Sequence, residues 1–157
     1  MPTHPSDSVE MQAGYADLQQ HIVEYLSQAH DLRRQLADKE QERQDQLREF
    51  LLGQIELLDA FERKEANLRE KYEDGLEALK IINSYGTIQK RVLQQLSRHG
   101  VSRITFPENR LIIGLSKVVE TEPDASKPND TIISVINHGY VRGNMVLREA
   151  ELIVVKN

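Results

Sequence analysis

The sequence predicts an α+β protein that begins with a long coiled-coil helix, continues through a short helical bundle and ends in a small β domain. Three observations predict this order: an apolar seam near the N-terminus, a second amphipathic run after residue 75, and clusters of β-branched residues after Gly100. We expect four segments within the 157 residues. They are a disordered tail (1–8), a coiled-coil rod (9–46), a helical bundle segment (47–100) and a β domain (101–157).

The seam of the rod consists of apolar residues spaced alternately four and three apart. Its members are Met11, Tyr15, Leu18, Ile22, Tyr25, Ala29, Leu32 and Leu36. A period of 3.5 residues keeps one narrow stripe of a helix facing a partner helix. Full burial of a large side chain yields about 1.5–3 kcal/mol, whereas ordering the backbone costs about 1–2 kcal/mol for every residue, so the helix needs a partner. No second run of similar length follows, which favours a homodimer over a hairpin within one chain.

Charged and polar residues interrupt the seam over residues 37–46. The seam positions are occupied there by Lys39, Arg43 and Gln46. One interpretation is a solvated helix face, and the other is a weakened zone that opens on heating or on meeting a partner. The sequence leaves both interpretations open.

The apolar stripe widens from Leu47 to Phe61, as it does in a helix with more than one neighbour. Asp74-Gly75 predicts a turn within residues 72–75. A second amphipathic helix is expected from Leu76, with its end at His99-Gly100. These features predict the helical bundle segment.

Short runs rich in β-branched residues predict the strands of the β domain. We expect extended structure at residues 102–106, 111–120, 131–137, 140–142 and 145–155. Residues 123–130 contain two prolines and are predicted to form a loop. Gly143-Asn144 separates two extended runs by two residues, which predicts a hairpin turn.

The composition disfavours several kinds of partner. A formal net charge of −5 argues against nucleic acid, because phosphate binding needs an excess of Lys and Arg. The absence of cysteine excludes disulfides, thiolate metal sites and a cysteine nucleophile. No stretch is long and apolar enough for a membrane span, and the N-terminus lacks the regions of a signal peptide. We therefore expect a cytoplasmic protein with neither a nucleic-acid nor a membrane partner.

No constellation of catalytic residues emerges from the spacing of polar side chains. The histidines are scattered, and no pair has the spacing of metal ligands on one helix face. Asp59 and Arg63 lie four residues apart, which predicts a helix-face ion pair rather than acid-base catalysis. We expect no catalytic residue, no metal and no cofactor, and hence no enzyme.

Arg148 is unusual because it alternates with apolar residues. Within the run 145–155 it shares one strand face with Val146, Ala150, Leu152 and Val154. Its charge is therefore expected either to reach solvent at a sheet edge or to meet a partner.

Three segments occur in the order and spacing of one known family. They are Leu-Asp-Ala-Phe-Glu-Arg at 58–63, Leu-Ser-Arg-His-Gly-Val at 96–101, and Gly139-Tyr140 with Val146-Leu147-Arg148 and the run from Ala150 to Lys156. They resemble motifs of the GrpE family, the nucleotide exchange factors of DnaK-class chaperones. The family motifs read Leu-Asp-Asn-Leu/Phe-Glu-Arg, Leu-Glu-Lys-His-Gly-Val, and Gly-Tyr, Val-Leu-Arg-Pro-Ala and Val-x-Val-x-Lys. The order of helices and strands expected from this sequence resembles the architecture of the family over nearly the whole chain.

Several positions depart from the family pattern. Arg110 and Leu111 follow Phe106-Pro107-Glu108-Asn109 where the family usually has a histidine. Glu149 and Glu151 replace a proline and a methionine, and Met145 stands where a basic residue is common. The Gly-Val/Ile-Glu that opens the second bundle helix is missing near residues 83–85. The chain is thus identified as a divergent member of the family.

The resemblance implies a function in which no covalent bond is made or broken. In the family, the β domain of one protomer holds open the nucleotide cleft of the chaperone, so ADP leaves. Carried over to this sequence, Gly139, Tyr140 and Arg148 shape or contact that surface, while Asp59, Phe61 and Arg63 lie in the supporting bundle. The expected partners are a second copy of the chain and a DnaK-class chaperone, in a role that supports protein folding and the stress response.

The alternative hypothesis is a dimeric coiled-coil scaffold or adaptor whose β domain binds another protein without affecting nucleotide. An enzyme would require a pocket with converging polar groups, which the sequence does not indicate.

Overall fold

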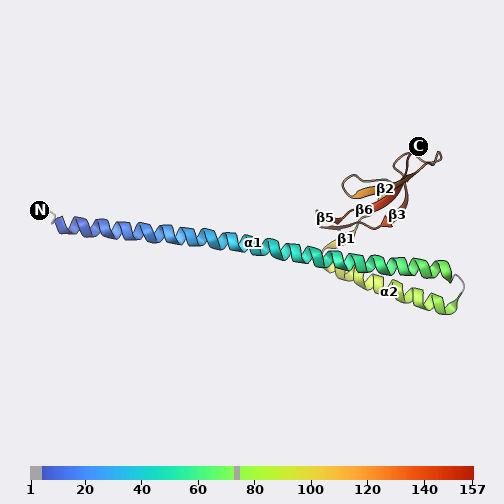
Figure 1. The fold of residues 1–157 in the computed structure, drawn as a ribbon, viewed down its shortest axis with the longest axis horizontal. Coiled ribbons are helices and arrows are strands. Elements are labelled where there is room, and N and C mark those ends of the chain that lie inside the picture. The colour runs from blue at the N-terminus through green and yellow to red at the C-terminus, as the bar shows by residue number, and fades with distance from the viewer. Residues whose placement is uncertain (1–4, 73–74) are drawn as a thin grey trace. The chain divides into compact units, whose positions relative to one another are not determined.

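The computed structural model describes residues 5–72 and 75–157, with side chains described from residue 14 onward. Helix α1 spans Pro5–Lys71 and helix α2 spans Leu76–Arg98. The β domain follows, with β1 at Val101–Arg103, a 3₁₀ turn at Pro107–Asn109, β2 at Ser116–Glu122, β3 at Ile132–Asn137, β4 at Tyr140–Arg142, β5 at Met145–Arg148 and β6 at Ala150–Val155 (Figure 1). The predicted α+β class is confirmed.

The chain divides into two compact units, residues 1–47 and 48–157, and each is described by itself. Helix α1 begins at Pro5, so residues 5–8 of the predicted tail are helical. Residues 1–4 lie outside the described part of the chain. The four-part division predicted from the sequence stays a prediction.

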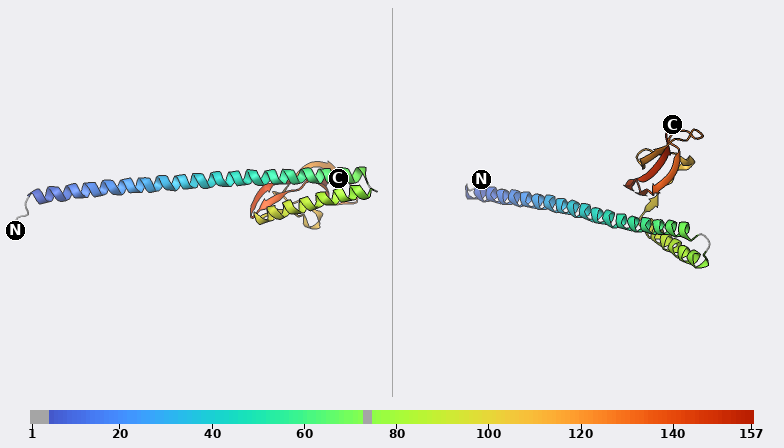
Figure 2. Two further views of the ribbon diagram at one scale, coloured as in Figure 1. Left: turned by 90° about the horizontal axis from the view of Figure 1, so that it is seen from below. Right: turned by 45° about the vertical axis from the view of Figure 1, so that its right-hand side comes forward.

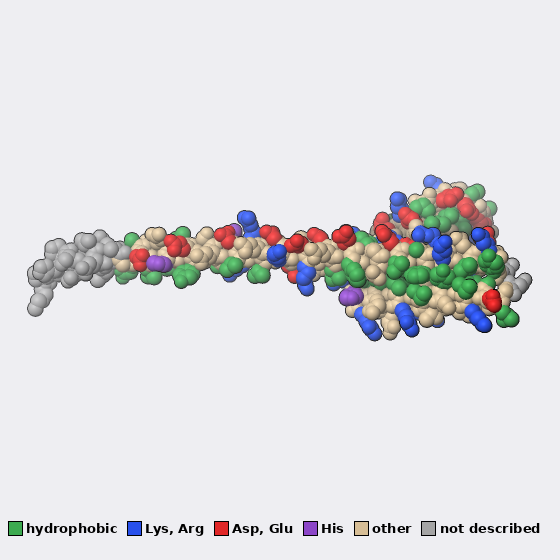
Figure 3. Space-filling view, turned by 60° about the horizontal axis from the view of Figure 1, so that its bottom comes forward, with side chains coloured by type: hydrophobic (Ala, Val, Ile, Leu, Met, Phe, Trp, Pro, Cys, Tyr) green, Lys and Arg blue, Asp and Glu red, His purple; other side chains and the backbone are tan. Residues whose placement is uncertain are grey.

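In the first unit, most of the described seam side chains are exposed in the single chain. Tyr15, Leu18, Ile22, Tyr25, Leu32 and Leu36 are between 48% and 71% exposed. Ala29 is half-buried, and the side chain of Met11 lies outside the described residues. Hydrophobic side chains recur along one side of the helix in Figure 3. This stripe is available to a partner.

The polar stretch 37–46 carries contacts along its own helix face. Glu40 accepts hydrogen bonds from the Arg43 and Gln44 side chains, and Lys39 pairs with Glu42. The bond from Arg43 lowers the pKa of the Glu40 carboxyl. These exposed contacts are typical of a solvated helix face, while opening on heating stays a prediction.

In the second unit, α2 runs alongside the C-terminal part of α1 (Figures 1 and 2). The buried apolar side chains of the described helix pair are Leu51, Ile55, Leu58, Ile82 and Leu96. The predicted turn at 72–75 includes residues 73 and 74, which lie outside the described residues.

The end of α2 is closed by backbone hydrogen bonds. The His99 amide donates to the Leu96 carbonyl at 3.0 Å, and the Gly100 amide donates to the Ser97 carbonyl at 2.9 Å. Gly100 has φ of +74°, a conformation that glycine adopts without a steric penalty. The predicted helix end at His99-Gly100 is therefore confirmed.

The strands form two three-stranded sheets in the described part of the chain, with orders β1-β4-β5 and β2-β6-β3. Strand β6 is parallel to β2 and antiparallel to β3. The side chains of Ile132, Ala150, Leu152 and Val154 form a buried cluster, against which Phe106, Leu111 and Val135 pack. This small core belongs to the β domain alone.

Three predicted strands are wrong in their extent. The run predicted at 102–106 is a strand only over Val101–Arg103, and residues 104–106 lie outside it. The run 145–155 is two strands, because the chain leaves one sheet at Glu149 and enters the other at Ala150, whose amide donates to the Leu115 carbonyl at 3.0 Å. The run 111–120 becomes a strand only at Ser116, since Gly114 bends the chain with φ of +83°.

Other predictions for the β domain are confirmed. Gly143-Asn144 forms the turn between β4 and β5, which pair antiparallel. The loop at 123–130 lies between β2 and β3.

Candidate functional site

Tyr140 lies at the centre of the region that the sequence singles out. It begins β4, and its side chain is fully buried. Gly139 beside it is buried too, and a Cβ on Gly139 would lie 2.5 Å from the Ala150 amide nitrogen and 2.7 Å from Ile104 Cδ1. Only glycine fits that close approach of backbone to backbone. Both residues therefore shape the β domain from inside.

Arg148 is held by α1 and by the backbone of the β domain. Its Nη1 donates to Asp59 Oδ2 at 2.5 Å and its Nη2 to Asp59 Oδ1 at 3.0 Å, a bidentate ion pair. Its Nε and Nη2 also donate to the His138 carbonyl, at 3.1 Å and 2.6 Å. Arg148 thus meets a carboxylate of its own chain, which neither outcome expected from the sequence included.

The expected pairing of Asp59 with Arg63 is wrong. Asp59 is only 8% exposed and directs its carboxylate to Arg148. Arg63 lies on the exposed face of α1. The β domain supplies a cation to the buried face of the helix, which spacing within the helix could not indicate. Phe61 does lie between the helices, with its ring 5.8 Å from that of Tyr85.

Arg103 on β1 forms the second half of the arrangement. Its Nε and Nη2 donate to the Tyr140 hydroxyl at 3.2 Å and 3.0 Å, and its Nη2 also bonds to Glu62. The guanidinium carbons of Arg103 and Arg148 lie 5.7 Å and 5.6 Å from the centre of the Tyr140 ring. Both distances are in the range of cation–π contacts.

We call these five residues the Tyr140 clamp: Asp59, Glu62, Arg103, Tyr140 and Arg148. Sequence reasoning assigned no role to Arg103 or Glu62. A signal for Glu62 was present, since it lies three residues after Asp59 and therefore on the same helix face.

The surroundings of the clamp shift the pKa values of Arg103, Tyr140 and Arg148. The hydrogen bonds that Arg148 donates to Asp59 raise the pKa of Arg148, and burial raises the pKa of the Tyr140 hydroxyl. The pKa of Arg103 is raised as well, because its bonds to Tyr140 and Glu62 outweigh its burial. Burial lowers the pKa of His138, which favours a neutral imidazole beside the two guanidinium groups. Two cations therefore flank a neutral tyrosine at pH 7.

Two of the family departures lie next to the clamp. Glu149 is exposed between β5 and β6. Glu151 is half-buried and accepts a hydrogen bond from the Asn137 side-chain amide at 2.6 Å. The surface around Arg148 thus carries an added exposed carboxylate.

The other two substituted positions are exposed. Met145 is 44% exposed at the start of β5, and Arg110 is exposed where its backbone pairs with Thr131.

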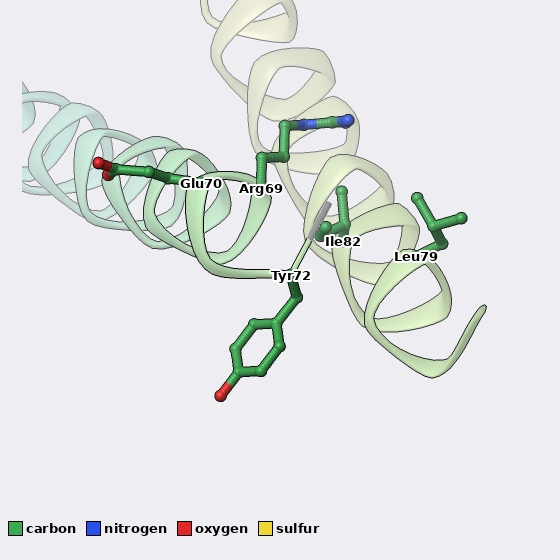
Figure 4. Close-up of a pocket in the computed structure, with 5 residues that line it drawn as sticks. All are labelled: Arg69, Glu70, Tyr72, Leu79 and Ile82. Atoms are coloured by element: carbon green, nitrogen blue, oxygen red, sulfur yellow. The ribbon is translucent and has the colours of Figure 1, made fainter. Parts of the chain in front are cut away.

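The helix pair has hollows that are lined by residues of both helices. Figure 4 shows one of about 300 Å³, lined by Arg69, Glu70, Tyr72, Leu79 and Ile82. The Tyr72 ring points away from the two α2 side chains (Figure 4). Among the described residues, no three His, Asp or Glu side chains are grouped so as to hold a metal ion. In the same residues, no helix has the length and apolar character to cross a membrane.

The helix pair also presents apolar side chains to solvent. Figure 3 shows a band of them along the two helices. The exposed apolar residues of these helices include Phe50, Leu57, Leu79, Ile81 and Ile88, each at least 40% exposed. An exposed apolar face of this kind marks an interaction surface.

Comparison with known proteins points to one family. The model of a family described as GrpE matches residues 5–156. A Protein GrpE from Synechococcus sp. is 26% identical over 122 residues, covering 78% of this chain and 50% of the relative. One from Chelativorans sp. is 29% identical over 109 residues, covering 69% and 48%. One from Agrobacterium fabrum is 28% identical over 160 residues, covering 98% and 75%. The chain spans about half the length of the first two relatives.

Proposed function

This chain belongs to the GrpE family, and from that premise we propose that it is a nucleotide exchange factor of a DnaK-class chaperone. The match over residues 5–156 carries the proposal. The architecture supports it, because a folded β domain is joined to helices whose apolar faces are open to a second copy.

The proposed mechanism is linkage between two binding equilibria. The β domain binds the open form of the chaperone's nucleotide-binding domain better than the closed form, which holds ADP more tightly. A ligand that favours the open form therefore lowers the affinity for ADP, and no covalent bond changes. Gly139 and Tyr140 are buried, so they shape the chaperone-binding surface of the β domain from inside. The side chain of Arg148 is 25% exposed and can contact the chaperone directly.

The proposed active form is a homodimer. The seam of the first unit and the apolar band of the second both lack cover within the chain. In a dimer, each seam leucine that becomes fully buried contributes about 1.5–3 kcal/mol to the stability of the complex. This contribution offsets the conformational entropy that is lost when the helix becomes ordered.

Release of a fluorescent ADP analogue from the cognate chaperone, followed by stopped flow, tests the proposal. We expect release to accelerate with protein concentration until it saturates. Arg148→Ala should lose most of the acceleration, and Arg91→Ala, which removes an exposed arginine of α2, should retain it. Unchanged release at saturating protein, with binding retained, would establish the scaffold alternative instead.

A further inference from the structure

The β domain is joined to the two helices in different ways. It leaves α2 through His99 and Gly100, and β1 is the strand whose backbone lies close to that helix. The long side chains of Arg103 and Arg148 make polar links to α1. The orientation of the domain on α1 therefore depends on side-chain contacts that can open without unfolding a strand.

The Tyr140 clamp ties those contacts into one unit. Asp59 and Glu62 lie three residues apart on one face of α1, and each receives one arginine of the β domain. The two arginines come from β5 and β1, the outer strands of one sheet, and both contact the ring of Tyr140 on the central strand β4. A rotation of the domain about residues 99–100 has to break both ion pairs.

The two arginines of the clamp are also less sealed from water than the core of the β domain. The side chains of Arg103 and Arg148 are 29% and 25% exposed, whereas Leu152 and Val155 are fully buried. Polar contacts with water access open at lower cost than a closed apolar core.

We propose that the Tyr140 clamp is a latch that fixes the angle of the β domain on the helix pair. When both ion pairs open, the domain swings about the connection at residues 99–100 and keeps its own fold. The latch is a property of the chain alone and goes beyond the proposed exchange activity.

Distance distributions between two spin labels test the latch. The chain has no cysteine, so Lys64→Cys on α1 and Lys117→Cys on β2 give unique exposed labelling sites. Labelled chain is mixed with excess unlabelled chain, so that only distances within one protomer are measured. We expect a single narrow distribution in the otherwise unchanged protein. Asp59→Asn with Glu62→Gln should make it roughly twice as wide, as expected for hinge motion.

Glu49→Gln with Glu56→Gln is the matched control, because it removes the same charge from exposed positions of α1. Protection of the β6 amides from hydrogen exchange reports whether the domain remains folded. If the double variant fails to fold, Tyr140→Phe takes its place, since it removes only the hydroxyl that Arg103 contacts, and it should broaden the distribution less. A folded variant of either kind with an unchanged distribution would overturn the proposal, as would equal broadening in the control.

Discussion

Arg148 on β5 and Asp59 on α1 form a bidentate ion pair between residues 89 positions apart in the sequence. The pair brings a residue that the sequence places in a β domain onto a residue that it places in a helical bundle. The side chain of Asp59 is 10% exposed and that of Arg148 is 25% exposed, so the pair is only partly shielded from water.

The coupling between these two residues can be measured by a double-mutant cycle. We expect Asp59→Ala and Arg148→Ala to be coupled by about 1–3 kcal/mol in the free energy of unfolding, because each single change strands a partly buried charge. The measurement is chemical denaturation at one fixed protein concentration.

Asp59→Ala with Arg63→Ala is the matched cycle, since this pair was predicted from helix spacing alone. Its coupling should stay below about 0.5 kcal/mol, the range of exposed pairs. Equal coupling in the two cycles would contradict the structure.

Gly139→Ala should destabilise the β domain by about 1–3 kcal/mol, the usual cost of overpacking. The new methyl would lie 2.5 Å from the Ala150 nitrogen, and that backbone cannot move without shifting β6. Hydrogen exchange of the β6 amides measures the effect.

The same substitution at Gly86 serves as the control. Gly86 lies inside α2, where a Cβ meets no atom within 4 Å. Gly86→Ala should therefore stabilise the protein by about 0.5–1 kcal/mol, because alanine loses less backbone entropy in a helix. Destabilisation at both positions would show that the contact with Ala150 is not the cause.

Leu32→Lys should reduce the helical signal of the first unit in circular dichroism. Leu32 occupies a seam position, and a lysine there places a charge between two helices. Leu26→Lys is the control, because Leu26 is similarly exposed, at 65% against 59%, but lies off the seam. An equal loss of helical signal in both variants, or no loss in either variant, would exclude the predicted seam as the contact surface.

Asp124 should titrate far below an ordinary aspartate in nuclear magnetic resonance. Its bonds with Lys127, and then with Ser126, lower its pKa to about 2. A carboxyl whose pKa is lower in the folded state stabilises that state at pH values above its unfolded-state pKa of about 3.9. This contribution to stability is lost as the pH falls through about 2.

Lys127→Ala should therefore raise the pKa of Asp124 toward its ordinary value. Lys117→Ala, on the exposed strand β2, should leave it unchanged. A normal pKa in the unaltered protein would show that the loop contacts do not persist in solution.

Local sequence signals were sufficient wherever one short segment decides the structure. Gly143-Asn144 forms a hairpin turn, and Gly100 ends α2, because these conformations depend on a few neighbouring residues. The heptad spacing likewise identified a helix whose apolar stripe is exposed in the single chain.

Contacts between distant segments could not be predicted in the same way. Alternation placed Arg148 on the apolar face of one long strand, but the strand breaks at Glu149 because the chain changes sheets there. The partner of Arg148 lies on another element, and helix spacing assigned that partner to Arg63 instead. The clamp therefore became visible only in three dimensions.

The claim that this chain opens the nucleotide cleft of a DnaK-class chaperone is tested most directly by an equilibrium measurement. Its affinity for the cognate chaperone is measured without nucleotide and with saturating ADP, for example by calorimetry. Linkage requires that ADP weaken the complex by the same factor by which the protein weakens ADP binding. We predict a loss of affinity of about 5-fold or more, the lower end of such couplings. Equal affinities with and without ADP would contradict the account.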